Sequence, residues 1–153
     1  MRQLKKLKLI WGLLLAPVLI SGFATSSIAT EVVMYKNPSC GCCAGWAKHM
    51  RKAGFTVKEL PREDMSVVKK KYGVSDGLAS CHTAIVDGYV IEGHVPASDV
   101  LRLLKERPNI VGLTAPGMPM RSPGMQAEDQ TPKHYDVLAF DKQGKAKIYH
   151  RYD

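Results

Sequence analysis

The sequence predicts a single mixed α/β domain, for three reasons. Short apolar runs rich in β-branched residues alternate along the chain with segments whose apolar residues recur at helical spacing. The chain has 153 residues, and domains usually contain ~100–150. Hydrophobic residues make up 45% and charged residues 24%. This is ordinary for a globular protein and excludes a disordered, collagen-like, coiled-coil or polytopic membrane chain.

The first predicted unit is a strand followed by a helix. Residues 31–35 form a β-rich apolar run that ends at a Lys-Asn-Pro loop, as a strand does when it enters a turn. From Cys43 onward the apolar residues fall at helical spacing, and Gly54 is a good C-terminal cap.

A second strand and a second helix follow. Residues 55–60 have the composition of a strand, and Pro61 ends it. Asp64 is suited to be the N-cap of a helix that Gly73 ends.

The third unit is a tight hairpin with a helix after it. Two β-rich runs, 83–86 and 89–92, are separated by an Asp-Gly dipeptide, which is a strong signal for a two-residue turn. Pro96 then opens a helix that Pro108 ends.

The last part of the chain combines an irregular segment with a second hairpin. Residues 109–134 carry four Pro, three Gly and three Met without periodicity, and irregular segments this long are usually functional or disordered. Residues 136–141 and 145–149 flank a Gln-Gly turn. The order strand, helix, strand, helix, hairpin, helix is that of a thioredoxin-like α/β domain. We therefore expect a thioredoxin-like single domain with a C-terminal β-hairpin and a Pro/Gly/Met-rich loop.

The first 29 residues have the layout of a secretory signal peptide. Four basic residues precede an apolar run from Leu9 to Phe23, and Ser27 and Ala29 fit the small positions of a cleavage site. The run has 15 residues, fewer than the ~20 that span a bilayer; an uncleaved anchor or a buried helix is the alternative. We expect residues 1–29 to be removed on export to the periplasm, which would leave a domain over 30–153 with no membrane span.

The distribution of charge argues against nucleic-acid binding. The chain has 22 basic and 14 acidic residues, a net charge of +8, but residues 1–29 carry four of the basic ones and no acidic one. The remaining 124 residues, with 18 basic and 14 acidic side chains, have a net charge of +4. The basic clusters that remain, 69–71 and 142–147, contain no aromatic residues suited to base stacking. A solvated helix face and a hairpin end explain them better.

Three cysteines lie within four residues at the expected start of the first helix. Cys40 and Cys43 form a C-x-x-C pair where the helix dipole stabilises a thiolate. Such a pair fits a metal site, or a dithiol oxidoreductase with Cys40 as nucleophile and Cys43 as resolving thiol. A structural disulfide, Cys40–Cys43 or one of the pair with Cys81, is a third interpretation. Cys42 favours metal, because a third thiol invites scrambling in an oxidoreductase, whereas each added sulfur strengthens a thiolate cluster.

The fourth cysteine stands directly before the first hairpin, in Ser80-Cys81-His82-Thr83. In thioredoxin-like proteins the loop at this point lies against the C-x-x-C pair and normally carries a cis-proline. Cys81 and His82 would then offer a thiolate and an imidazole, with His82 either a ligand or a hydrogen-bond partner. His94 follows the hairpin and is expected at the same end, as a ligand or as a structural histidine. The other histidines are expected to be solvated or otherwise ordinary: His49, His134 and His150.

Three methionines lie among the prolines and glycines of residues 115–125. Methionines in this setting cannot serve a periodic helix or strand core. A thioether is a soft ligand that forms no disulfide, which suits Cu(I) outside the cytoplasm. Packing beneath a loop is the alternative. Met118 and Met125 occupy equivalent Pro-Gly-Met segments and are favoured over Met120.

Taken together, these motifs resemble the CopG-like family of exported copper-resistance proteins. The likeness covers residues 32–152, and the family motifs are Pro-x-Cys-x-Cys-Cys at 38–43, Ser-Cys-His-Thr at 80–83, Glu-Gly-His-Val-Pro at 92–96 and the paired Pro-Gly-Met segments within 116–125. The resemblance implies a thioredoxin-like fold that binds copper through cysteine sulfur, with several ions sharing bridging thiolates. Arg121 and Gln126 depart from the family pattern. Neither is a soft ligand, so the departure concerns loop shape.

The ligand types also point to copper without the resemblance. Clustered thiolates with imidazole and thioether select Cu(I) or Zn over Mg, Ca or Mn. Zinc would favour a closed four-ligand site built from two C-x-x-C motifs, but this chain has only one such motif. Methionine is also a poor zinc ligand. The expected metal ligands are Cys40, Cys42, Cys43, Cys81, His82, His94, Met118 and Met125.

We therefore expect a periplasmic copper-binding protein that contributes to copper resistance. Its expected partners are copper ions and other exported copper-handling proteins, and redox handling of Cu(I)/Cu(II) is a further hypothesis. No residue is assigned a catalytic role. The alternatives are a periplasmic thiol–disulfide oxidoreductase that uses the Cys40/Cys43 pair and a secreted scaffold with structural disulfides.

Overall fold

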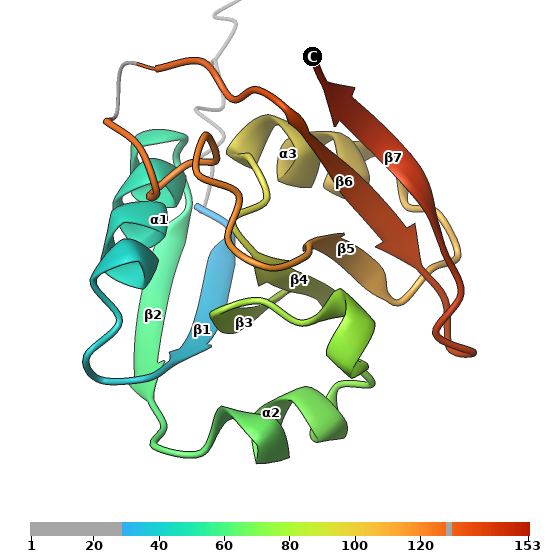
Figure 1. Ribbon diagram of the computed structural model, residues 1–153, viewed down its shortest axis with the longest axis horizontal. Helices are drawn as coiled ribbons and strands as arrows, with labels where there is room; N and C mark the ends of the chain where they lie inside the picture. Colours follow the sequence, from blue (N-terminus) through green and yellow to red (C-terminus); the bar gives the residue numbers. More distant parts are fainter. Residues whose placement is uncertain (1–28, 128–129) are drawn as a thin grey trace, which may run out of the picture.

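A seven-stranded sheet organises the part of the chain that the computed structural model describes, residues 29–127 and 130–153 (Figure 1). The expected signal peptide lies outside this part, apart from its last residue. The strands are β1 (Glu31–Lys36), β2 (Thr56–Pro61), β3 (His82–Val86), β4 (Tyr89–Gly93), β5 (Gly112–Ala115), β6 (Tyr135–Phe140) and β7 (Ala146–Tyr152). Their order in the sheet is β2-β1-β3-β4-β5-β6-β7. The described residues form one mixed α/β domain, as predicted.

The sheet is mixed, with two parallel and four antiparallel strand pairs among the described residues. β1 runs parallel to β2 and antiparallel to β3, and β3 and β4 form the predicted hairpin at Asp87 and Gly88. β4 runs parallel to β5, and β5, β6 and β7 are antiparallel neighbours. The predicted C-terminal hairpin is therefore confirmed, and it extends the same sheet.

Strand β5 lies inside the stretch that we expected to be irregular throughout. All four of its residues are buried, so the strand lacks the alternation of apolar and polar residues that marks a half-buried strand. It begins at Gly112, where a Cβ atom would collide with the backbone carbonyl of Val90 on β4. The glycine allows the two strands to approach, and a glycine-led strand of four residues gives little signal in the sequence.

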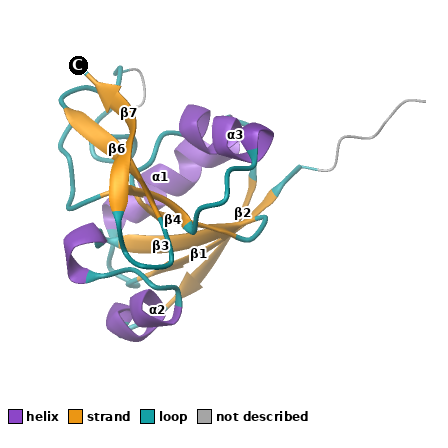
Figure 2. Cartoon of the chain, turned by 90° about the vertical axis from the view of Figure 1, so that its right-hand side faces the viewer, coloured by secondary structure: helices purple, strands orange, loops and turns teal. Residues whose placement is uncertain are grey.

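Three α-helices cover the sheet in the described part of the chain: α1 (Gly41–Lys52), α2 (Met65–Lys71) and α3 (Ala97–Glu106), with a short 3₁₀ turn at Asp76–Leu78. Figure 2 shows α1 and α3 on one face of the sheet and α2 on the other. The three α-helices match the predicted ones closely. Asp64 is the predicted N-cap of α2, since its carboxylate accepts a hydrogen bond from Ser66 N–H at 2.8 Å.

Helix α1 begins at Gly41, with Cys40 as its N-cap residue, so the first turn contains the cysteine loop. Its buried side is formed by Cys43, Trp46, Ala47 and Met50. The prediction that His49 is solvated is wrong. The imidazole is half-buried, and its Nε2 accepts a hydrogen bond from Ala97 N–H at 3.0 Å, so it links α1 to the start of α3.

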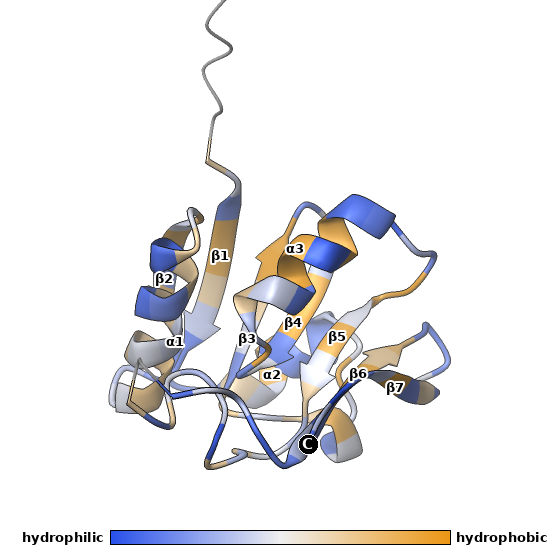
Figure 3. Cartoon of the chain, turned by 90° about the horizontal axis from the view of Figure 1, so that it is seen from above, coloured by the Kyte–Doolittle hydropathy of each residue, from blue (hydrophilic) through white to orange (hydrophobic). Residues whose placement is uncertain are grey.

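The core lies between the central strands and the helices α1 and α3. Its fully buried side chains include Met34, Trp46, Ile91 and Leu103, and Figure 3 shows apolar residues concentrated on the central strands and on the side of α3 that faces them. Burying apolar surface at ~25 cal/mol per Å² is the main stabilising contribution to such a fold. Within residues 29–127 and 130–153, none of the helices has the length and hydropathy needed to cross a bilayer.

Candidate metal centre

The cysteine loop is shaped by a turn between β1 and α1. The side-chain oxygen of Asn37 accepts a hydrogen bond from Ser39 N–H at 3.0 Å, and its backbone carbonyl accepts one from Cys40 N–H at 3.0 Å. Asn and Asp readily form such local side-chain to backbone bonds, which compete with regular structure. The turn delivers Cys40 to the N-cap position of α1, where the first N–H groups of the helix are unpaired.

All four cysteine sulfurs meet at this end of the sheet. The Sγ atom of Cys81 lies 3.6 Å from that of Cys43 and 3.9 Å from that of Cys42, and Cys42 Sγ lies 3.5 Å from Cys40 Sγ. The four sulfurs lie within 4.8 Å of one another. The antiparallel pairing of β3 with β1 brings Cys81, 38 residues after Cys43, against the cysteine loop.

Two of these sulfurs are joined, since Cys40 and Cys43 form a disulfide while Cys42 and Cys81 are free thiols. This is one of the pairings that the structural-disulfide interpretation allows. A disulfide sulfur is not a thiolate, and metal ligation by cysteine requires the thiolate. In this state two thiols can take metal, and reduction of Cys40–Cys43 raises the number to four.

Two buried imidazoles complete the cluster. His94 Nε2 lies 2.8 Å from Cys81 Sγ, and His82 Nδ1 lies 3.4 Å from the same sulfur. On the far side of its ring, His94 Nδ1 donates to the Pro123 carbonyl at 2.7 Å. Because a carbonyl only accepts, the proton of His94 is on Nδ1, and the lone pair of Nε2 faces Cys81. A hydrogen bond of this kind orients an imidazole for metal ligation.

The segment that carries His94 is held against α1 by Trp46. The indole Nε1–H donates to the Val95 carbonyl at 2.8 Å. The ring of Trp46 also packs on His82, with ring centroids 4.5 Å apart, and His82 meets His94 edge-on at 5.1 Å. Both imidazoles are fully buried, and His82 Nε2 has no hydrogen-bond partner within the described residues.

Burial governs the protonation of the cluster. It raises the pKa of the Cys81 thiol to about 12, and the neighbouring Cys42 thiol raises it further. Burial also lowers the pKa of His82 well below its ordinary value and lowers that of His94. Near neutral pH the imidazoles are therefore neutral and able to ligate metal, whereas a metal that binds Cys81 must displace its proton.

The two Pro-Gly-Met segments are both anchored to the residues of this centre. In the first, Gly117 N–H donates to the Ala79 carbonyl at 2.9 Å, and the Ser80 hydroxyl donates to the Gly117 carbonyl. In the second, Pro123 holds His94, and Gly124 packs on the backbone of α1.

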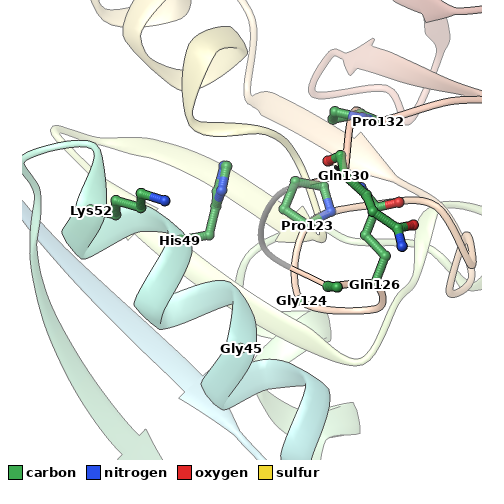
Figure 4. A pocket seen from close by; sticks show the side chains of 9 residues that line it. Gly45, His49, Lys52, Pro123, Gly124, Gln126, Gln130 and Pro132 are labelled. Carbon is green, nitrogen blue, oxygen red and sulfur yellow. Dashed lines mark hydrogen bonds between the residues drawn. The ribbon is translucent and has the colours of Figure 1, made fainter.

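The three methionines of this loop differ in exposure. Met118 is 57% exposed and Met120 is 70% exposed, whereas Met125 is half-buried. The glycines that precede the two predicted methionine ligands are thus held against Ala79 and the backbone of α1, next to the segments that carry the cysteines. The loop then crosses α1, and Figure 4 shows Pro123, Gln126 and Gln130 facing His49 and Lys52 across a pocket of about 200 Å³.

Comparison with known proteins identifies the family. A family model described as a protein of unknown function, DUF411, matches residues 78–125. Two solved structures of a copper resistance protein copG, Form 2 and Form 1, are each 40% identical to this chain. They match 82% of it and 100% and 98% of their own chains, with TM-scores of 0.75 and 0.74. This chain belongs to the CopG family. No curated protein matches it in sequence.

The CopG-family site contains one feature that the sequence motifs did not assign. Behind Cys81 and His82, the fully buried carboxylate of Glu92 accepts hydrogen bonds from Ser80, Thr83 and Lys69. The signal for it was a single charged residue at the end of an apolar strand, in Tyr-Val-Ile-Glu-Gly. A charged side chain in such a position is buried only when it is paired.

Proposed function

We propose that this protein binds copper at the cysteine and histidine cluster and contributes to copper resistance. The observation that carries the proposal is that four sulfurs converge at one end of the sheet and that two buried imidazoles lie against one of them, Cys81. The cysteine loop, the Cys81-His82 dipeptide and the His94 segment each supply part of this cluster. The solved CopG structures that this chain matches are of a copper resistance protein.

The donor set fits copper. Thiolates, imidazoles and the nearby thioethers are soft or borderline ligands, which Cu(I) prefers and which Mg, Ca and Mn do not. Nε2 of His82 is buried and has no hydrogen-bond partner among the described residues, so no bond on that side prevents Nδ1 from presenting its lone pair to the cluster. The sulfurs of the two free thiols, Cys42 and Cys81, lie 3.9 Å apart, close to the ~3.8 Å between thiolates on one tetrahedral metal with ~2.3 Å bonds, so zinc is the metal to test against copper.

We place the centre on a thioredoxin-like framework. The order β2-β1-β3-β4, with α1 between two parallel strands and α3 after an antiparallel hairpin, supports this assignment. In such a framework the cysteines at the start of α1 benefit from the helix dipole, which favours thiolates. With export to the periplasm by residues 1–29, the centre would work in a compartment that favours disulfides, with copper ions and other exported copper-handling proteins as partners.

Redox handling of copper is part of the proposal. Copper held by bridging thiolates would be able to change valence without large ligand loss, and Met118 and Met125 would add thioethers, which do not form disulfides. A redox titration of the copper-loaded protein tests this. We expect a reversible Cu(I)/Cu(II) step, and its absence would remove the redox role while leaving copper binding in place.

One experiment decides the proposed function. The protein is purified from its own compartment, its metal content is measured by elemental analysis, and its free thiols are counted. Copper in the purified protein, with thiols that become reactive when the metal is removed, is the expected result. Zinc, or no metal at all with Cys40–Cys43 oxidised, would contradict it.

The Cys40–Cys43 disulfide favours a second candidate, a thiol–disulfide oxidoreductase. This candidate predicts that the metal-free protein reduces or oxidises a model disulfide such as insulin. It also predicts that Cys42→Ser and Cys81→Ser retain that activity, because only Cys40 and Cys43 exchange. The copper proposal predicts instead that Cys42→Ser or Cys81→Ser lowers the copper stoichiometry while the protein remains folded, since each substitution removes a ligand.

A further inference from the structure

Glu92 is a carboxylate buried directly behind the metal centre. It lies on β4 opposite Thr83 of β3, and none of its surface is exposed. Oε1 accepts the backbone N–H of Ser80 at 2.7 Å, and Oε2 accepts the hydroxyl of Thr83 at 2.6 Å. A buried carboxylate is costly unless such bonds and a counter-ion compensate it.

The two donors flank the dipeptide that serves the site. Ser80 precedes Cys81 and Thr83 follows His82, so one carboxylate holds both ends of the Cys81-His82 segment. Cys81 Sγ is the atom of this segment that lies nearest to the other sulfurs and to His94 Nε2. Any change in the path of the Ser80–Thr83 backbone therefore moves the sulfur on which the cluster converges.

Lys69 supplies the counter-ion from the opposite face of the sheet. Its ammonium, on α2, lies 2.5 Å from Glu92 Oε1 and 3.3 Å from the Thr83 hydroxyl, and its side chain is 15% exposed. Lys69 and Ser80 therefore donate to Oε1 and Thr83 donates to Oε2, so both oxygens of the carboxylate accept hydrogen bonds. Charge-assisted hydrogen bonds of this kind are shorter and stronger than neutral ones.

The same strand leaves Ser80 little freedom to move. Gly93, the next residue after Glu92, has φ +72°, and a Cβ atom there would collide with the side chain of Ser80. Ser80 also pairs with Gly117 at the first Pro-Gly-Met segment. Glu92 is thus placed where the Cys81-His82 segment, the His94 segment and the methionine loop meet.

We infer that Glu92 is a positioning residue of the metal centre, which sets the place of Cys81 through its bonds to Ser80 and Thr83. The inference rests on the proposed copper-binding function. Residues that orient metal ligands without touching the metal typically contribute about 10- to 100-fold to metal affinity. Lys69 is a third donor to the same carboxylate, so that Glu92 ties α2 to both ends of the Cys81-His82 segment.

The test compares Glu92→Gln with the wild-type chain in two measurements. Copper affinity is measured for the reduced protein by competition with a colorimetric Cu(I) chelator, and we expect it to fall about 10- to 100-fold. In the metal-free protein, the reaction of Cys42 and Cys81 with a maleimide is followed over time. We expect a faster reaction in the variant, because the segment that carries Cys81 is released.

Asp99 offers a matched control. It is 1% exposed, and it is held by Arg102 at 3.2 Å, by His150 at 2.8 Å and by the Tyr152 hydroxyl at 2.8 Å, away from the cysteines. Asp99→Asn should lose stability, as Glu92→Gln does, yet retain the wild-type copper affinity and maleimide rate. Thr83→Val, which removes one donor and preserves shape, replaces Glu92→Gln if the latter does not fold, and should change both readouts in the same direction.

The outcomes separate the inference from the function on which it rests. Wild-type affinity and wild-type maleimide rates in Glu92→Gln, or equal changes in Asp99→Asn, would overturn the positioning role. A wild-type protein that binds no copper would overturn the proposed function instead. The maleimide rates need no metal, so they test the positioning role in that case too.

Discussion

Cys81 is the residue on which the cluster depends. Its sulfur contacts Cys42, Cys43, His82 and His94, and it comes from a different segment than the other cysteines. Burial raises the pKa of its thiol to about 12, so a copper ion that binds Cys81, as we propose, would displace a proton from it. Copper affinity should consequently rise with pH while that thiol remains protonated.

Replacing Cys81 by serine tests its role as a ligand. Cys81→Ser removes the central sulfur and preserves the size of a half-buried side chain, so we expect less copper per chain in a protein that remains folded. Elemental analysis and circular dichroism measure the two effects. Met120→Leu is the control, because Met120 is 70% exposed and is not an expected ligand. A Cys81→Ser protein with the wild-type copper content would contradict the assignment.

Asp136 gives a prediction about pH away from the cysteine and histidine cluster. Arg151 donates two hydrogen bonds to its carboxylate, at 2.9 and 3.0 Å, and lowers its pKa. A carboxyl whose pKa is lower in the folded state contributes stability above its unfolded pKa of ~3.9 and loses that contribution as pH falls through the folded value. In Arg151→Gln, an NMR titration should show the pKa of Asp136 returning upward. The pKa of Asp64, which the Ser66 hydroxyl lowers, should not change.

At the scale of elements, most of the chain was predictable because its signals are local. The Asp64 cap, the Asp-Gly turn and the final hairpin each depend on a few neighbouring residues, and all are confirmed. Strand β5 was not predicted because both of its faces are buried, so its residues do not alternate between apolar and polar. Its position depends on pairing with β4 and β6, which lie far from each other in the sequence. The hydrogen bond from Ala97 N–H to His49 was also not predictable from local signals, because the two residues lie on different helices and are 48 positions apart in the sequence.

The two Pro-Gly-Met segments are equivalent in sequence and differ in packing. A Cβ atom at Gly124 would lie 2.5 Å from Trp46 N and 2.7 Å from the Cys42 carbonyl, whereas one at Gly117 would meet nothing within 4 Å. Both glycines have positive φ angles, +87° and +70°, so alanine at either position is strained by ~1–2 kcal/mol.

We therefore expect Gly124→Ala to destabilise the protein more than Gly117→Ala. The additional cost is that of overpacking, ~1–3 kcal/mol, because the second segment must lift from α1. Denaturant unfolding measures the free energies. An NMR signal from the His94 ring should shift in Gly124→Ala and stay in place in Gly117→Ala, since Pro123 holds that ring. Equal effects of the two substitutions would show that the loop does not rest on the helix.

For the whole molecule, metal binding, disulfide state and stability are linked. Copper that binds only the folded state stabilises it by RT ln(1 + [L]/Kd), about 4 kcal/mol at a thousandfold excess over Kd. The oxidised chain offers two thiols and the reduced chain four. The convergence of these cysteines and histidines was predictable from the motifs and the order of elements, but the distances between their side-chain atoms follow from the register of the strands.

The reduced and oxidised forms should accordingly differ in their response to copper. Protein treated with a phosphine reductant should bind more Cu(I) per chain than oxidised protein, and its melting temperature should rise more with added Cu(I). Elemental analysis after gel filtration and a thermal melt measure the two effects. Cys40→Ser/Cys43→Ser is the control, because reduction cannot change the number of its thiols. Equal copper content in the two wild-type forms would exclude Cys40 and Cys43 as ligands.

The separation of Cys81 from the cysteine loop has a consequence for folding. Cys40, Cys42 and Cys43 are neighbours in any conformation of the chain, but Cys81 reaches them only after β3 has paired with β1. Long-range pairings of this kind form slowly compared with local ones. A chain that meets copper before it folds thus presents a three-sulfur site that differs from the native one. If the protein binds copper as we propose, an ion that binds before the chain folds would be held outside the native site, whereas one that binds afterwards would enter it.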